Sequence, residues 1–300
     1  MKLARFHSDT GPKLGLVGDD VVYDLAGLAA DANLEWLAAT FTSLRSTLLA
    51  GDAALEIAGD LVAGAHGRYA YGLEQTKLLA PFEPGSKLLC HVVNYLEHAE
   101  EAQLDPPERP FFFVKIATTP VHPGEPVLSQ PSSHQLDFES ELGVVIGRRA
   151  RNVKAADAYD YIAGYTVVND VSHRDLQFNK GVEGLSLRYG KNWTQGKGLD
   201  GAAAIGPWIA GRDEVGEPYP LSIKARVNGA EQVNAKTADQ IFRVPELLES
   251  LSTDLTLYPG DVIATGAPAG GGIGTGRYLR PGDIVECEVE RVGLLSNPVR

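Results

Sequence analysis

Three acidic residues stand out in the segment HQLDFESELGVVIG, residues 134–147. Asp137, Glu139 and Glu141 are spaced two apart, so in a β-strand their side chains would share one face. Three like charges on an otherwise apolar strand repel one another and are costly to bury unless a cation neutralises them. Carboxylate oxygens favour Mg²⁺, Mn²⁺ or Ca²⁺ over Zn²⁺. The segment therefore predicts a metal site, with an exposed acidic face on an edge strand as the alternative.

A third carboxylate for such a site follows the next apolar strand. In GYTVVNDVSHRDLQ, residues 164–177, the apolar run ends in Asn169 and Asp170. A carboxylate at the end of a buried strand is well placed to complete a set of metal ligands. Asp170 also fits as the cap of the short polar helix expected after it, because Asn and Asp are favoured there. Both interpretations stay open at this point.

An acid–base pair is predicted in the segment CHVVNYLEHAEEAQL, residues 90–104, which passes from strand to helix near Asn94. His98 and Glu101 are three residues apart, a spacing that places both on one helical face. A carboxylate beside an imidazole orients the ring and raises its basicity, which makes a general base able to activate water. The same spacing is common on solvated helices, so a purely structural pair is the alternative.

The charge and composition of the chain exclude several classes of partner. With 27 Lys and Arg against 39 Asp and Glu, the net charge is −12, which argues against nucleic acid because phosphate binding relies on clustered basic residues. No apolar stretch approaches the roughly 18 residues of a membrane span, and MKLARFHSDT lacks the apolar core of a secretory signal. We expect a cytoplasmic protein without membrane or nucleic-acid partners. Its two cysteines, Cys90 and Cys287, are expected to be buried thiols.

The elements that would position these residues indicate two domains. Residues 1–75 show alternating short strands over 1–25 and a helical period over 31–65 that Gly51 interrupts, which predicts a small structural α/β domain. Residues 76–300 are mostly strands and turns around the predicted site. The chain is therefore predicted to be α+β with a mixed β core. Strands are expected at 111–115, 138–147, 164–169, 222–227, 261–265 and 284–289, and helices at 95–104, 155–162, 173–178 and 244–253.

Two conspicuous features are predicted to have no catalytic role. The segment AGGGIGTGRYLRPGD, residues 269–283, is glycine-rich, but Arg277 occupies the place of the last glycine in a G-x-G-x-x-G run, and a Pro-Gly turn follows instead of a helix. We expect a flexible hairpin here and no nucleotide loop. Trp36, Trp193 and Trp208 are spread through the chain and are expected to be packing residues.

Six segments, taken in order, resemble the fumarylacetoacetate hydrolase family, and together they cover its whole catalytic domain. The first two resemble an opening strand with a His-bearing helix and a lysine-containing strand with its loop. The next two resemble the metal-ligand segments, and the last two the catalytic-lysine segment and the closing loop. They are KLLCHVVNYLEHAEE (87–101), PFFFVKIATTPVHPGEPV (110–127), DFESELGVVIG (137–147), YTVVNDVSHRDLQ (165–177), NWTQGKGLDGAAAIGPWI (192–209) and LTLYPGDVIATGAPAG (255–270).

The resemblance implies a fold and a set of site residues. The implied fold is a mixed β-sandwich roll behind a small N-terminal α/β domain, and the implied assembly is a homodimer. Glu139, Glu141 and Asp170 would bind Mg²⁺ or Mn²⁺, His98 and Glu101 would form a water-activating dyad on a segment that can close as a lid, and Lys197 would lie near the substrate's oxygens with Arg174 and Gln177 in support.

The sequence departs from the family's pattern close to these positions. His91 and His173 stand where the family usually has small residues, and Ala267 replaces a threonine that is common in the closing loop. The stretch 180–191 lies between the metal-ligand and lysine segments, and we expect it to shape the substrate pocket. These differences are interpreted as changes in specificity.

The resemblance implies a small 2-oxo acid as the substrate, and such an acid is consistent with the metal site because its carboxylate and carbonyl can chelate one ion as a bidentate pair. Such an ion stabilises the enolate that forms when the next C–C bond breaks, and Lys197 would add positive charge where an oxyanion develops. The first hypothesis is hydrolysis of an acylpyruvate-like 2,4-dioxo acid. Decarboxylation of oxaloacetate or isomerisation of a 2-hydroxyhepta-2,4-diene-1,7-dioate-type substrate would use the same site. A catalytically silent binding protein is the third alternative.

Overall fold

The computed structural model describes residues 1–117 and 120–300, so Thr118 and Thr119, in the loop predicted after strand 111–115, lie outside the described residues. The strands are β1 (Lys2–Ser8), β2 (Gly11–Val17), β3 (Val21–Asp24), β4 (Ala70–Gly72), β5 (Leu78–Leu79), β6 (Leu88–His91), β7 (Phe112–Lys115), β8 (Leu136–Asp137), β9 (Ser140–Ile146), β10 (Ile162–Asp170), β11 (Ser172–His173), β12 (Ala203–Gly211), β13 (Ser222–Val227), β14 (Ala230–Lys236), β15 (Val262–Ala264), β16 (Ile284–Val289) and β17 (Gly293–Pro298).

Most helices are short. They are α1 (Leu25–Asp31), α2 (Glu35–Thr40), α3 (Leu44–Ala50), α4 (Asp52–Ala63), α5 (Leu96–Glu101), α6 (Arg174–Gln177), α7 (Glu183–Tyr189), α8 (Trp193–Lys197), α9 (Arg212–Val215), α10 (Val244–Asp254) and α11 (Gly272–Thr275), with 3₁₀ helices η1 (Ala155–Tyr161) and η2 (Thr237–Asp239). Across the described part of the chain, no helix is both long and apolar enough to cross a membrane.

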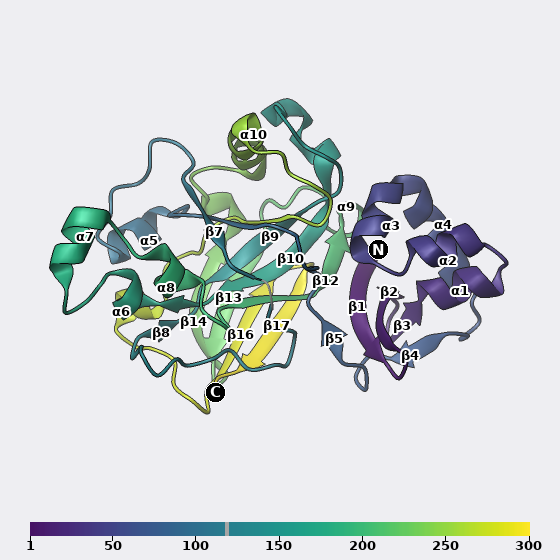
Figure 1. Cartoon of the computed structure of the whole chain (residues 1–300), viewed down its shortest axis with the longest axis horizontal. Coiled ribbons are helices and arrows are strands. Elements are labelled where there is room, and N and C mark those ends of the chain that lie inside the picture. Colours follow the sequence, from purple (N-terminus) through teal and green to yellow (C-terminus); the bar gives the residue numbers. More distant parts are fainter. Residues whose placement is uncertain (118–119) are drawn as a thin grey trace.

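The architecture is a large mixed sheet packed against a smaller one, which confirms the predicted α+β class (Figure 1). The eleven-stranded sheet runs β4-β3-β2-β1-β12-β10-β9-β15-β6-β7, with β5 paired to β1, and only its β15–β6 pair is parallel among the pairs the structure describes. The smaller sheet runs β14-β13-β16-β17, and β11 pairs with β8 separately. This arrangement leaves the central strands β9 and β10 covered on both faces.

Two hydrophobic cores explain why the central strands are apolar almost throughout. Leu142 and Val144 of β9 face the smaller sheet, where they share a core with Cys287 of β16. Val145 of β9 and Val168 of β10 face the other way, into a core shared with the N-terminal helices. A strand buried on both sides loses the polar alternation of a half-exposed one. A charged side chain on either face of these strands is therefore buried.

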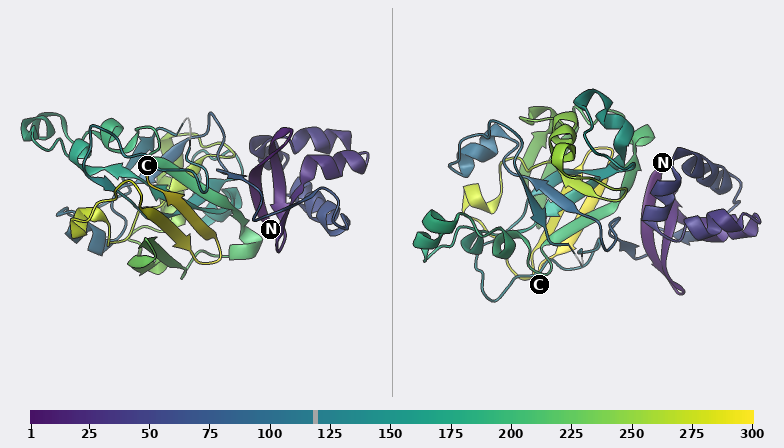
Figure 2. Two further views of the ribbon diagram at one scale, coloured as in Figure 1. Left: turned by 90° about the horizontal axis from the view of Figure 1, so that it is seen from below. Right: turned by 45° about the horizontal axis from the view of Figure 1, so that its top comes forward.

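The N-terminal elements form one end of the molecule and also extend the large sheet (Figures 1 and 2). Lys2 and Leu3 of β1 lie in register with Ala210 and Ile209 of β12. The predicted boundary at residues 75 and 76 stays a prediction, since the hydrogen bonding is continuous across these two strands. The helical period expected over 31–65 is confirmed in its break at Gly51, since α3 ends at Ala50 and α4 begins at Asp52. It is wrong before Gly51, where the chain forms the separate helices α2 and α3, and the Ser43 side chain caps α3 by accepting from the N–H of Ser46.

Two further predictions are corrected near the site. The strand expected from residue 138 begins only at Ser140, because the N–H of Glu139 donates to the side chain of Asn169 (3.0 Å) instead of to a ladder partner. The glycine-rich segment is not a flexible hairpin. It contains the helical turn α11, which ends at the left-handed residue Gly276. By contrast, β13 and β16 have the predicted bounds, and α10 differs from its prediction by one residue.

Candidate active site

Sheet register brings the predicted metal ligands together. Glu141 of β9 lies opposite Val168 of β10, and the N–H of Asp170 donates to the carbonyl of Glu139 (2.9 Å), so the two strands place all three carboxylates at one end of the same face. Ligand oxygens from Glu139, Glu141 and Asp170, here called the carboxylate triad, lie within 4.8 Å of one another, and all three residues are buried. An exposed acidic strand is therefore excluded. Asp170 is not a helix cap either, because α6 begins after His173.

Two members of the triad are neutralised by cations of the chain. Lys115 Nζ lies 2.5 Å from Asp170 Oδ1, and Lys197 donates to Asp170 Oδ2 (2.8 Å) and to Glu139. Glu139 also accepts from Arg174. Burial acts to raise the pKa of Glu139, but Arg174 and Lys197 outweigh it and hold that pKa well below its usual value. Burial likewise acts to lower the pKa of Lys197, yet Asp170 and Glu139 raise it.

Glu141 is the exception. Its Oε2 accepts one hydrogen bond, from the N–H of Gly266 (2.6 Å), and within the described residues it forms no ion pair with any cation. Burial, followed by the charges of Asp170 and Glu139, raises the pKa of Glu141 well above its usual value. A buried carboxylate beside two others provides a set of oxygen ligands, which fits Mg²⁺ or Mn²⁺. These three residues are the ones that would hold such an ion.

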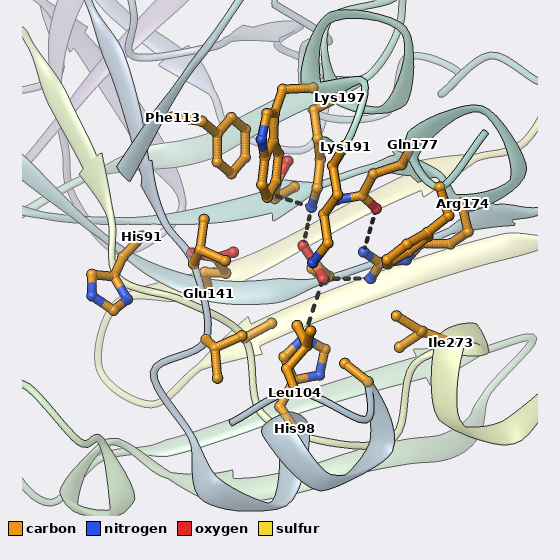
Figure 3. Close-up of a pocket in the computed structure, with 18 residues that line it drawn as sticks. His91, His98, Leu104, Phe113, Glu141, Arg174, Gln177, Lys191, Lys197 and Ile273 are labelled. Carbon is orange, nitrogen blue, oxygen red and sulfur yellow. Dashed lines mark hydrogen bonds and ion pairs between the residues drawn. The ribbon is translucent and has the colours of Figure 1, made fainter. Parts of the chain in front are cut away.

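The predicted acid–base dyad lies against the triad. His98 is buried, which excludes a solvated helix pair, and its Nδ1 is 3.6 Å from Glu101 Oε2 while its Nε2 is 3.5 Å from Glu139 Oε1. Both contacts are longer than hydrogen bonds, and each becomes an ion pair when the imidazole is protonated. Glu101 is held from behind by the N–H of Gly270 (2.9 Å). The imidazole thus lies between Glu101 and Glu139. Figure 3 shows His98 on the side of the pocket opposite Lys197 and Gln177.

Arg174 and Gln177 fix the other side of the site. Arg174 Nε donates to Asp137 Oδ2 (2.8 Å) and Nη1 to Gln177 Oε1 (3.0 Å). Asp137 is thereby kept out of the triad, and it also accepts the N–H groups of Gly272 (2.5 Å) and Ile273 (3.0 Å). The acidic residue at 137 is thus a support for Arg174 and for α11, and it contributes no oxygen to the metal group.

One pocket gathers seven of the eight predicted site residues, and Glu101 lies behind His98 outside its lining. A cavity of about 30 Å³ remains between them, room for one or two water molecules. An apolar wall of Leu104, Ala267 and Ile273 completes the pocket. The site is therefore tightly packed, and a substrate must displace some of the internal ion pairs.

Four residues at or beside the pocket were given no individual role in the site from the sequence, although Lys191 ends the stretch 180–191 that was expected to shape the pocket. Lys115 is fully buried on β7, and a lysine inside the apolar run FFFVK was the signal that could have revealed it. Phe113 and Lys191 line the pocket, as does Trp193, whose ring stacks on Phe113 at 4.8 Å. The prediction that the tryptophans are packing residues is confirmed for Trp208, which packs against the core, and is wrong for Trp36, which is 61% exposed. Trp193 also departs from it, because it lines the pocket.

Comparison with known proteins agrees with this geometry. The model of the fumarylacetoacetate (FAA) hydrolase C-terminal family matches residues 87–300. The chain is 34% identical over 303 residues to oxaloacetate tautomerase fahd2, mitochondrial, of Xenopus laevis, covering 100% of this chain and 90% of that one. The structure of fumarylacetoacetate hydrolase from psychrophilic Exiguobacterium antarcticum matches with a TM-score of 0.80 at 29% identity, over 100% of this chain and 99% of that one.

A second solved structure carries a different activity in its name. It is 2-hydroxyhepta-2,4-diene-1,7-dioate isomerase from Mycobacterium marinum, with a TM-score of 0.73, 31% identity, and coverage of 100% of this chain and 98% of that one. The named activities thus differ among proteins of similar fold. The match to the family model over most of the length and the full-length relative together show that the chain belongs to the fumarylacetoacetate hydrolase family.

Proposed function

We propose that the chain is a divalent-metal-dependent enzyme that interconverts the keto and enol forms of a small 2-oxo acid of the oxaloacetate type. The observation that carries the proposal is the imidazole of His98 beside the carboxylate triad, with Nε2 3.5 Å from Glu139 Oε1. Tautomerisation needs a proton carrier at C3 and no second reactant. The name of the relative from Xenopus laevis supports the same choice.

Each group has a distinct part in this chemistry. When bound by the triad, Mg²⁺ or Mn²⁺ supplies Lewis acidity toward the carboxylate and carbonyl oxygens of the substrate. His98 takes a proton from C3 of the keto form while Glu101 keeps the ring in place. The protonated imidazole of His98 then returns this proton, directly or through water, to the C2 oxygen, so the enol forms with no net change in atoms and the ring is neutral again. Lys197 places its positive charge near that oxygen while negative charge develops there.

The test is the rate at which the near-ultraviolet absorbance of freshly dissolved oxaloacetate enol approaches equilibrium. In the variant His98→Asn we expect the enzymatic rate to fall by about 10²- to 10⁴-fold, with Mg²⁺ affinity retained in calorimetry. The matched control is His134→Asn, which alters an exposed histidine and should leave the rate unchanged. A wild-type rate that survives full chelation, or an unaffected His98→Asn variant, would refute the proposal.

Hydrolysis of an acylpyruvate is the second candidate, favoured by the placement of Glu101 3.6 Å from His98 Nδ1. This arrangement suits a general base for water. Water would add to the C4 carbonyl, the C3–C4 bond would break, and a carboxylic acid and pyruvate would leave. Pyruvate release from a 2,4-dioxo acid tests it on the same preparation. Decarboxylation of oxaloacetate would release pyruvate and carbon dioxide, so product analysis separates the two reactions.

The homodimer is also proposed. β7 lies at an edge of the eleven-stranded sheet, and the neighbouring apolar side chains Phe111, Val114 and Ile116 are 51%, 64% and 48% exposed in the single chain. Exposed apolar patches of this kind are typical of interaction surfaces. Sedimentation should show a dimer for the wild-type protein and a higher dimer dissociation constant for Val114→Lys. A monomer at every concentration would contradict the proposal.

A further inference from the structure

Lys191 brings into the pocket a positive charge that has no carboxylate partner. It lines the same pocket as the triad, and across residues 1–117 and 120–300 it forms no ion pair. The other two cations of the lining differ in this respect. Arg174 is paired with Asp137 and Glu139, and Lys197 with Glu139 and Asp170. One cation is therefore left over after the internal pairs are formed.

Aromatic rings hold this lysine in place. Its Nζ lies 4.9 Å from the ring centroid of Phe178 and 5.7 Å from that of Trp193. Trp193 stacks on Phe113 with ring planes 19° apart, and Lys197 Nζ lies 5.5 Å from the Phe113 centroid. The two lysines thus belong to one layered stack of cations and rings. Cation–π contacts fix the ammonium group without neutralising it.

The surroundings of Lys191 favour the arrival of an anion. Burial, followed by the nearby charges of Arg174 and Lys197, lowers the pKa of Lys191, while Glu139 acts in the opposite direction. A further carboxylate brought close to Lys191 would stabilise its charged form. Figure 3 shows the side chain reaching into the pocket from the same side as Lys197 and Gln177, with Leu104 and Ile273 on the opposite side. An anionic group in the pocket would therefore find its unpaired counter-charge at Lys191.

We propose that Lys191 is a specificity-determining residue that binds the second carboxylate of a dianionic 2-oxo acid whose 2-oxo acid end is held at the carboxylate triad. The inference rests on the proposed function, since the 2-oxo acid end has to occupy the triad and its cation. It selects within that substrate class: a four-carbon dicarboxylate is preferred over a 2-oxo acid with an alkyl tail. A charge-assisted hydrogen bond of this kind is worth about a 10- to 100-fold change in affinity.

The test removes the charge from the lysine in one arm and from the far end of the ligand in the other. Oxaloacetate and 2-oxobutyrate share the 2-oxo acid end and a three-carbon stem, and differ in carrying a carboxylate or a methyl group at the far end. Their dissociation constants are measured by calorimetry with freshly prepared ligands and Mg²⁺ on the wild type and on Lys191→Met. Lys191→Arg keeps the charge. Lys236→Met is the matched control, because Lys236 is an exposed lysine at the end of β14 and does not line the pocket.

The wild type should bind oxaloacetate about 10- to 100-fold more tightly than 2-oxobutyrate. In Lys191→Met this preference should fall to near unity through loss of oxaloacetate affinity alone, with 2-oxobutyrate binding showing that the site is folded. Lys191→Arg should keep most of the preference, and Lys236→Met all of it. A preference that survives in Lys191→Met, or an equal loss for both ligands, overturns the assignment. Tautomerase turnover is read separately, so failure of the proposed reaction would leave this comparison intact.

Discussion

Replacing Glu141 by glutamine should have opposite effects in the absence and in the presence of a divalent cation. Glu141 is 1% exposed and has the Gly266 N–H as its hydrogen-bond donor. At an effective dielectric constant of about 20, two like charges 4.8 Å apart repel by about 3.5 kcal/mol. Lys197 and Lys115 offset part of this repulsion, so we expect the metal-free variant to be about 1–2 kcal/mol more stable near neutral pH.

The pH dependence of that gain has a defined sign. The pKa of Glu141 in the folded protein is raised above its unfolded value of 4.5, so the folded state binds more protons than the unfolded state between these two values. The stability of the metal-free wild type therefore falls as pH rises through this window. Glutamine cannot ionise, so the advantage of the variant should be small at acidic pH and should grow toward neutral pH.

With metal present the order reverses. Loss of one of the three charged ligands should weaken Mg²⁺ binding by about 100-fold or more, because even outer contacts of metal sites change affinity 10- to 100-fold. Thermal unfolding in EDTA and in MgCl₂, together with calorimetry, measures both effects, and Glu97→Gln on an exposed position of α5 is the control. Unchanged Mg²⁺ affinity, combined with lower stability in EDTA, would show that Glu141 is not an uncompensated member of a cation site.

Two further predictions concern buried groups around the site. Burial lowers the pKa of His91 from 6.5 to about 4, so the unfolded state binds more protons than the folded state between these pH values. The stability of the protein should therefore fall as the pH drops from 6.5 to 4, and His91→Leu should remove up to about 3 kcal/mol of that fall, as measured by urea titrations. An unchanged dependence of stability on pH in the variant would contradict the prediction. Lys115→Met removes a buried partner of Asp170 and should cost about 3 kcal/mol or more without metal, with a larger Mg²⁺-induced rise in melting temperature than the wild type; equal rises would disprove this coupling.

Local sequence patterns predicted the elements that are apolar and regular. Strand β13 and helix α10 follow from alternation and helical period, and the two-residue spacing of Glu139 and Glu141 indicated a shared face. Asp137 has the same spacing but leaves that face, because the side chain of Asn169 on the next strand takes the N–H of Glu139. That contact joins positions thirty residues apart, so no local pattern contains it.

The same limit applies to the glycine-rich segment and to the internal cations. Nothing within 269–283 announces a helical turn; Asp137 stabilises it by accepting two of its N–H groups across more than a hundred residues. The apolar run FFFVK marks Lys115 as an unusual lysine, but the sequence does not show which partner Lys115 or Lys191 has. Tertiary packing distinguishes them, since it gives Lys115 a carboxylate and Lys191 two aromatic rings.

The pairing of β1 with β12 carries a consequence for any attempt to excise the family-matched region alone. Without β1, the row of amide and carbonyl groups along β12 that now faces Lys2 and Leu3 would be left bare. A strand that becomes an exposed edge in this way can pair with strands of other chains, which promotes aggregation. The groups left without partners would lie at Ile209 and Ala210, near the end of β12. The N-terminal elements thus supply the hydrogen-bond partner that β12 needs within the eleven-stranded sheet.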